Sequence, residues 1–127
     1  MKAIEVVRAV LRHQRAVVIY GFGTEGQRFL NICEALAIPI VEIVDDQVAA
    51  QGGRAVSFDT FAAKNEVDKS VVVLCTHSPE RMRKKLTERF PAATWLPLSA
   101  FQAYEPTIFT PFMFYEGLIA DKSTAHI

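Results

Sequence analysis

The run AVVIYGFGTEG, residues 16–26, most constrains what this chain can fold into. A continuous apolar stretch leads into three glycines spaced G-x-G-x-x-G, and apolar residues at helical spacing follow them. A buried strand, a glycine-rich turn and a helix in that order are typical of an α/β unit. The sequence therefore predicts a strand–turn–helix whose turn depends on Gly21, Gly23 and Gly26.

Each glycine of this loop has its own expected task. Gly21 lets the chain turn sharply off the strand, Gly23 leaves room for a pyrophosphate, and Gly26 lets the next helix pack closely. Free N–H groups and the positive end of the helix dipole attract an anion there, so no lysine is needed. The residues between the glycines complete the predicted cofactor-binding loop: Phe22, Thr24 and Glu25. The alternative interpretation is a plain tight turn without a ligand.

Two features of the loop refine this hypothesis. It lacks the Gly-Lys-Ser/Thr ending of a P-loop, which favours a dinucleotide or nucleotide-sugar over a nucleoside triphosphate. Thr24 and Gln27 have the spacing of a capping box, in which Thr24 would cap the helix and the helix would begin inside the glycine loop.

Two acidic residues end the second predicted strand. Asp45 lies 19 residues after Gly26, where a carboxylate can accept both ribose hydroxyls of an adenosine or uridine. That carboxylate would repel a 2′-phosphate, and no Arg or Lys lies between Asp45 and Gly53, so NAD is favoured over NADP. Asp46 is ambiguous, because one of the two acids is expected to face solvent and start a turn. The alternative is a pair of turn-forming acids without a ligand.

Predicted helices and strands alternate along the chain. After a helix near residues 4–11, the expected order is strand 16–20, helix 24–36, strand 39–44, short strand 55–57, short helix 58–64, strand 70–75, a helix capped by Ser78, and strand 94–98. Alternation of this kind predicts an α/β fold with a Rossmann-like, doubly wound parallel sheet, in a three-layer single domain.

This order brings a second loop to the same site, because ligands of doubly wound sheets bind beyond the carboxyl ends of the strands. Thr76, His77 and Ser78 follow the buried strand 70–75 and are expected to face the glycine loop. His77 is a candidate general acid or base, with a polar ligand contact as the alternative. Spacing identifies no second catalytic group, so the catalytic residues and any enzyme activity stay unassigned.

Composition limits the classes of function. The chain has 127 residues, half of them hydrophobic, as expected for one globular domain. Its 14 basic and 14 acidic residues cancel, which argues against a nucleic-acid partner. Cys33 and Cys75 lie in apolar segments, so we expect reduced core thiols of a cytoplasmic protein and no metal site. We expect no signal peptide and no membrane span.

The last part of the chain differs from the rest. Residues 108–127 concentrate aromatic and apolar side chains after the last predicted strand. We therefore expect a nucleotide-binding domain over residues 1–107 and a docking or dimerisation segment over 108–127. The expected partner is a second copy in a homodimer, or a missing catalytic domain.

Four motifs carry a resemblance to a known group of proteins: VVIYGFGTEG, VEIVDD, GGRAV and VVVLCTHSPER. Together they resemble the Rossmann-like N-terminal domains of bacterial sialic-acid and UDP-sugar acyltransferases, and similar modules precede some FkbM-type methyltransferases. The resemblance covers roughly residues 16–98. It implies that Asp45 or Asp46 contacts the uridine ribose and that Gly21, Gly23 and Thr24 contact phosphate.

The chain differs from this group at the positions where those proteins have their functional residues. Thr76-His77 stands where the acyltransferases have Gly-Asn or Gly-Asp, and their hexapeptide repeats are absent. Tyr20 stands where methyltransferases have an acidic residue. The sequence thus predicts a nucleotide-binding module for NAD or a nucleotide-sugar, accessory to a sugar-modifying transferase or methyltransferase. The alternative is a degenerate Rossmann scaffold that acts as an assembly domain without nucleotide.

Overall fold

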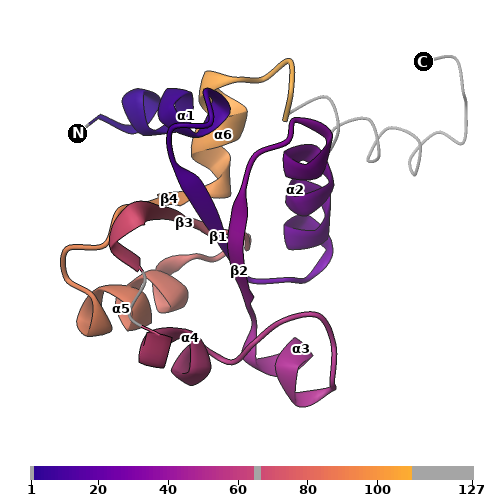
Figure 1. Ribbon diagram of the computed structural model, residues 1–127, viewed down its shortest axis with the longest axis vertical. Coiled ribbons are helices and arrows are strands. Elements are labelled where there is room, and N and C mark those ends of the chain that lie inside the picture. The colour runs from indigo at the N-terminus through magenta and orange to yellow at the C-terminus, as the bar shows by residue number, and fades with distance from the viewer. Residues whose placement is uncertain (1, 65–66, 110–127) are drawn as a thin grey trace, which may run out of the picture.

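A computed structural model describes residues 2–64 and 67–109, and Figure 1 shows an open sheet with helices packed around it. The sheet has four parallel strands in the order β2-β1-β3-β4. Their bounds are β1 Ala16–Tyr20, β2 Ile40–Val44, β3 Ser70–Leu74 and β4 Trp95–Pro97. The chain moves from β1 outward to β2 and then crosses to the other side of β1, which places the switch point between β1 and β3. The predicted α/β class and parallel sheet are confirmed, and the topology is compatible with a Rossmann-like fold.

Helices connect the strands, as parallel pairing requires. Their bounds are α1 Ala3–Leu11, α2 Thr24–Ala35, α3 Asp46–Ala50, α4 Phe58–Lys64, α5 Glu80–Arg89 and α6 Leu98–Tyr104, with a 3-10 turn η1 at Val67–Lys69. Among the residues that the structure describes, no helix is both long and apolar enough to cross a bilayer.

The core lies on both faces of the sheet, because successive strand side chains point to opposite sides. Val17 and Ile19 of β1 belong to a cluster with side chains of α1, α2 and α6. Val18 and Tyr20 belong to a second cluster with side chains of α4 and α5, the two helices labelled together in the lower part of Figure 1. Every residue of β3 is buried, as its continuous apolar run predicts for a central strand.

Three local predictions are wrong. The short strand expected at 55–57 is reduced to one bridge between Val56 and Val44, because the Phe58 N–H donates to Asp46 Oδ1 at 2.7 Å and the chain turns at once into α4.

The Thr24 capping box does not form. Gly23 is the N-cap of α2, without a side-chain cap, and the Gln27 amide nitrogen donates instead to the Phe22 carbonyl at 3.4 Å.

The third error concerns α5. Pro79, and not Ser78, is its N-cap, and the helix begins at Glu80. The helical face itself is as expected, since Leu86 and Phe90 are buried against the sheet.

The described fold continues past the domain boundary expected at residue 107. Phe109 is 1% exposed, and its ring centroid lies 5.8 Å from that of Phe29 and 5.2 Å from that of Phe101. Phe109 is therefore part of the core. The remainder of the expected docking segment, residues 110–127, lies outside the described residues.

Candidate functional site

The glycine loop is a tight turn at the carboxyl end of β1. Gly21 has φ +102°, and a Cβ placed on it would lie 2.8 Å from the Cys75 carbonyl oxygen. A Cβ on Gly26 would lie only 2.0 Å from the Gly21 carbonyl oxygen. The close packing expected of Gly26 is thus against the first residue of the loop itself. Both positions need glycine for the fold, whether or not a ligand binds.

Gly23 is different, because its surroundings are open. Its φ is −78°, which any residue can adopt, and a Cβ there would meet no atom within 4 Å. It is the N-cap of the 12-residue helix α2 and lines a cavity of about 310 Å³. First-turn N–H groups of a helix have no partner within the helix and carry the positive end of its dipole. Neither the backbone conformation nor the packing at position 23 therefore requires glycine.

Asp45 joins the end of β2 to the glycine loop. Its Oδ2 accepts a hydrogen bond from the Phe22 N–H at 2.7 Å, and its Oδ1 accepts one from the Val48 N–H at 3.0 Å, which caps α3. Asp45 also lines the same cavity as Gly23. Because each carboxylate oxygen has two lone pairs, Asp45 can still accept a ligand hydroxyl.

Asp46 has partners of its own. Its Oδ1 accepts from the Phe58 N–H, and its Oδ2 lies 3.1 Å from Lys85 Nζ. The Phe58 hydrogen bond lowers the pKa of Asp46 most, and Lys85 lowers it further against the opposing effect of burial. Asp46 does not line the cavity at the glycine loop but borders a neighbouring one.

The loop after β3 lies beside the glycine loop, at the carboxyl ends of the two neighbouring strands. Thr76 and His77 line the cavity together with Gly23, Thr24 and Glu25. His77 Nε2 lies 3.1 Å from Glu25 Oε2, with the histidine side chain 89% exposed and the glutamate 14%. The structure does not bring Ser78 into this cavity, and its N–H donates to Thr76 Oγ1 at 3.4 Å.

Two further cavities adjoin this one at the same end of the sheet. One, of about 380 Å³, shares Asp45 and Met82 with it, and the other, of about 160 Å³, shares Glu25, Thr76 and His77. The lining residues that sequence reasoning missed come from β1, α3 and α5 on one side and from Pro79 and the start of α6 on the other: Tyr20, Gln47, Arg81, Met82, Lys85, Pro79, Pro97, Leu98, Ser99 and Gln102.

Arg81 and Lys85 change one premise of the sequence argument. The stretch after Asp45 has no cation, but the fold brings these two from α5 to the cavity beside Asp45 and Asp46. Their i, i+4 spacing places both on one helix face. NADP therefore belongs beside NAD among the ligands to test.

The Cys75 thiol and the Tyr20 phenol at the site, and the core thiol of Cys33, are poor nucleophiles. Burial raises the pKa of Cys75 well above its usual value and that of Cys33 to about 12. Burial, followed by the charges of Asp46 and Asp45, raises the pKa of Tyr20 to about 12. Since a thiolate and not a thiol is the nucleophile, Cys75 is a core residue at neutral pH. The described residues contain no group of three His, Cys, Asp or Glu side chains placed to hold a metal ion.

Comparison with known proteins gave no match: no protein-family model, no curated protein and no solved structure matches this chain. Function is therefore inferred from the geometry of these three cavities and from the motifs that line them.

Proposed function

We propose that this chain is a nucleotide-binding module, a single three-layer Rossmann-like domain whose ligand is NAD or a nucleotide-sugar. One observation carries the proposal: the open N-terminus of α2 at Gly23, the Asp45 carboxylate and the Thr76-His77 loop line one cavity at the switch point of the sheet. Ligands of open α/β sheets bind at this place.

The proposed phosphate position is above Gly23 and Thr24. No lysine or arginine lines the central cavity, so the attraction for phosphate comes from the N-terminus of α2. Two carboxylates border the cavity, and each has a partner that offsets its charge. Glu25 is paired with His77, and Asp45 accepts two backbone N–H groups.

The rest of the ligand would extend to both sides. Asp45 would accept the ribose hydroxyls, and the base would enter the 380 Å³ cavity, against Tyr20 and Met82. The other half of the ligand would lie toward the 160 Å³ cavity, where Thr76, His77 and Ser99 offer polar groups. Phe22 and Gly26 would maintain the shape of the glycine loop. Asp46 and Ser78 would lie beside the central cavity without lining it.

We further propose that this module is cytoplasmic and accessory to a sugar-modifying transferase or methyltransferase, which the four motifs support. The second candidate function is an assembly scaffold without nucleotide. It is favoured by the internal hydrogen bonds of Asp45, because they hold the loop in place without any ligand.

A ligand panel distinguishes the two candidates. Thermal shifts are measured with NAD, NADH, NADP, UDP-sugars and S-adenosylmethionine, each at rising concentration. A true ligand at one hundred times its dissociation constant stabilises the fold by about 2.7 kcal/mol. No shift with any NAD form or UDP-sugar would leave the scaffold as the better account.

A further inference from the structure

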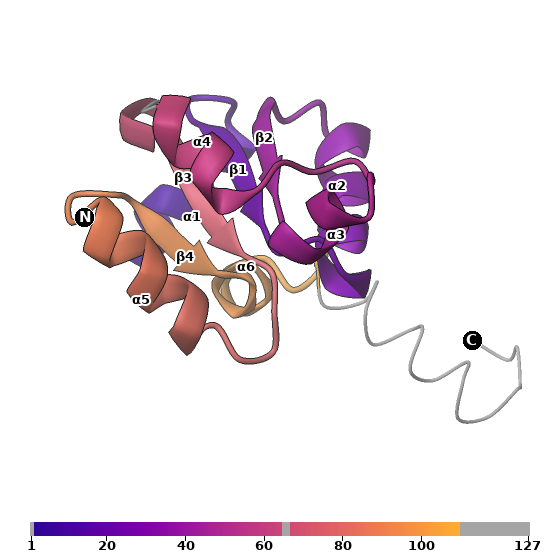
Figure 2. The same ribbon diagram turned by 90° about the horizontal axis from the view of Figure 1, so that it is seen from below.

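The cavity of about 380 Å³ beside Asp45 is lined by two acids and two bases. Asp45 and Asp46 follow β2, whereas Arg81 and Lys85 come from α5. Figure 2, which views the molecule from below, shows α3 on the β2 side and α5 on the β4 side. A ligand whose ribose contacts Asp45 therefore extends from the central cavity toward Arg81 and Lys85.

The two acids of this cavity already have partners within the protein. Asp45 caps α3, and its two carboxylate oxygens accept backbone N–H groups at 2.7 and 3.0 Å. Asp46 accepts the Phe58 N–H at 2.7 Å, and its second oxygen lies 3.1 Å from Lys85 Nζ. A carboxylate whose charge is offset in this way repels a nearby phosphate less than an unpaired one does.

Arg81 is the base of this cavity whose charge is not offset. Lys85 is paired with Asp46, but among the residues that the structure describes no carboxylate forms an ion pair with Arg81. Arg81 lies one helical turn before Lys85 on the same face of α5. A guanidinium group keeps its charge at any physiological pH, and its planar set of N–H donors matches the oxygens of a phosphate.

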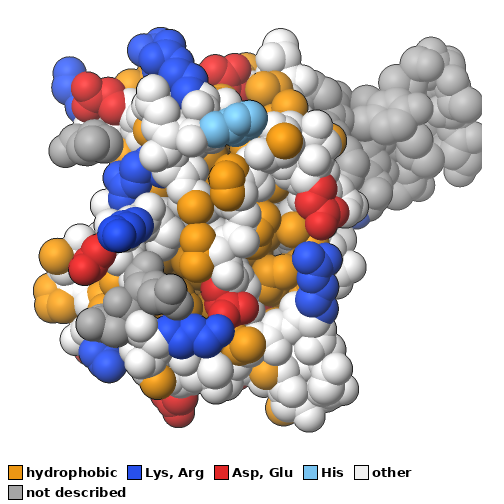
Figure 3. Space-filling view, in the orientation of Figure 1, with side chains coloured by type: hydrophobic (Ala, Val, Ile, Leu, Met, Phe, Trp, Pro, Cys, Tyr) orange, Lys and Arg blue, Asp and Glu red, His pale blue; other side chains and the backbone are white. Residues whose placement is uncertain are grey.

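The protein as a whole does not attract anions through its net charge. Its 14 basic and 14 acidic residues cancel. On the face shown in Figure 3, acidic and basic side chains lie interspersed around hydrophobic ones. Selective attraction of an anionic group therefore has to come from charges at the binding site itself.

We propose that the ligand is a dinucleotide with a phosphate on its adenosine ribose, of the NADP class, and that Arg81 binds this 2′-phosphate. The inference rests on the proposed nucleotide site. Asp45 would accept the 3′-hydroxyl alone, with the lone pairs that its two N–H contacts leave free. NAD would bind in the same place without the Arg81 contact, and therefore more weakly. This order of affinity is the reverse of the one predicted from the stretch between Asp45 and Gly53.

Calorimetry of the full chain with NADP and with NAD tests the inference. Wild type should bind NADP at least about tenfold more tightly, the usual effect of a hydrogen bond between charged groups. Arg81→Ala should weaken NADP binding about tenfold and leave NAD binding unchanged, because NAD has no group at this position. Arg81→Glu should make NAD the better ligand, since like charges would then face each other.

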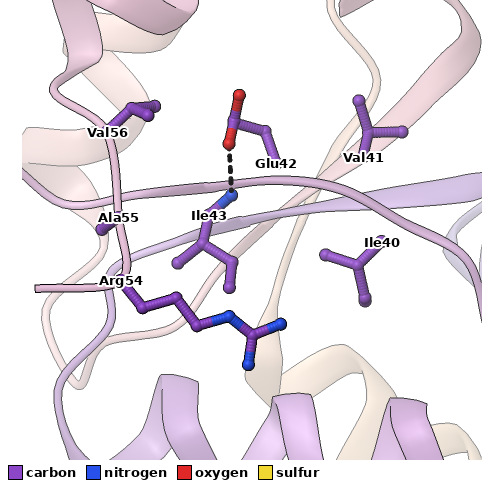
Figure 4. A pocket seen from close by; sticks show the side chains of 7 residues that line it. All are labelled: Ile40, Val41, Glu42, Ile43, Arg54, Ala55 and Val56. Carbon is purple, nitrogen blue, oxygen red and sulfur yellow. Dashed lines mark hydrogen bonds between the residues drawn. The ribbon is translucent and has the colours of Figure 1, made fainter.

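Arg54→Ala is the matched control. Arg54 is also an exposed arginine, but it lies beside a different cavity, of about 260 Å³, at the outer edge of β2 (Figure 4). That cavity shares no lining residue with the three at the glycine loop. Removing Arg54 should therefore change neither affinity, and thermal melts check that each variant folds.

The outcomes separate this inference from the proposed function. Equal wild-type affinities for NADP and NAD, or an Arg81→Ala loss that is the same for both, would overturn the inference and leave nucleotide binding intact. Binding of a UDP-sugar but of neither dinucleotide would do the same. A wild-type protein that binds none of the three ligands would refute the proposed function itself, and the inference with it.

Discussion

Replacing Gly26 by alanine tests whether the loop is held together by direct backbone contact. The added Cβ would lie 2.0 Å from the Gly21 carbonyl oxygen and 3.0 Å from its carbon. No rotation of a side chain relieves this overlap, because both partners are backbone, so the loop and α2 must separate. Overpacking of this kind costs about 1–3 kcal/mol or more. The better helix propensity of alanine offsets up to about 1 kcal/mol.

We therefore expect Gly26→Ala to lower the free energy of unfolding by about 2 kcal/mol, or roughly 5–10 °C in Tm. Urea denaturation followed by circular dichroism measures this loss. Gly23→Ser is the matched control, because a Cβ there meets no atom within 4 Å and serine is a good N-cap residue. Its free energy of unfolding should lie within about 0.5 kcal/mol of the wild-type value or above it. If Gly26→Ala is as stable as Gly23→Ser, the loop is not packed as described.

Three further predictions concern the core and the two acids. Phe109→Ala should destabilise the fold by about 3–5 kcal/mol in urea titrations, and a loss below about 1 kcal/mol would place Phe109 outside the core. Asp45→Ala should cost about 1–3 kcal/mol without any ligand, because two backbone N–H groups lose their acceptor; unchanged stability would contradict this. Asp46 has a lowered pKa when folded, so its carboxylate stabilises the fold above the unfolded value of about 3.9. The advantage of wild type over Asp46→Asn should be constant from about pH 5 to 8 and shrink below about pH 4; a difference independent of pH in thermal melts would oppose this assignment.

The sequence predicted those parts of the structure that depend on local pattern. The run before Gly21 forms a buried strand, and the apolar spacing after it forms a helix. Leu86 lies on the buried face of α5, and Phe90, the C-cap of that helix, is buried in the same cluster. Thr76 and His77 lie next to the glycine loop because β3 pairs with β1, so the loops that follow these two strands meet at the switch point of the sheet.

What the sequence missed depends on contacts between distant residues. Asp45 binds the Phe22 N–H from 23 positions away, a hydrogen bond that no spacing rule anticipates. Lys85 reaches Asp46 across 39 positions, so a cation missing from the local sequence is present in space. The Asp46 hydrogen bond to Phe58 likewise ends the expected strand at 55–57 after a single bridge, against its local preference.

The most direct test of the proposed function is nucleotide binding to wild type and Gly23→Val, measured by calorimetry with NAD and with a UDP-sugar. The valine side chain would occupy the cavity, where a Cβ has free space and φ is −78°, so the fold should survive, as a thermal melt can check. The proposal predicts that wild type binds one of the two ligands and that folded Gly23→Val does not. Equal affinities of the two proteins, or no binding by wild type, would contradict it.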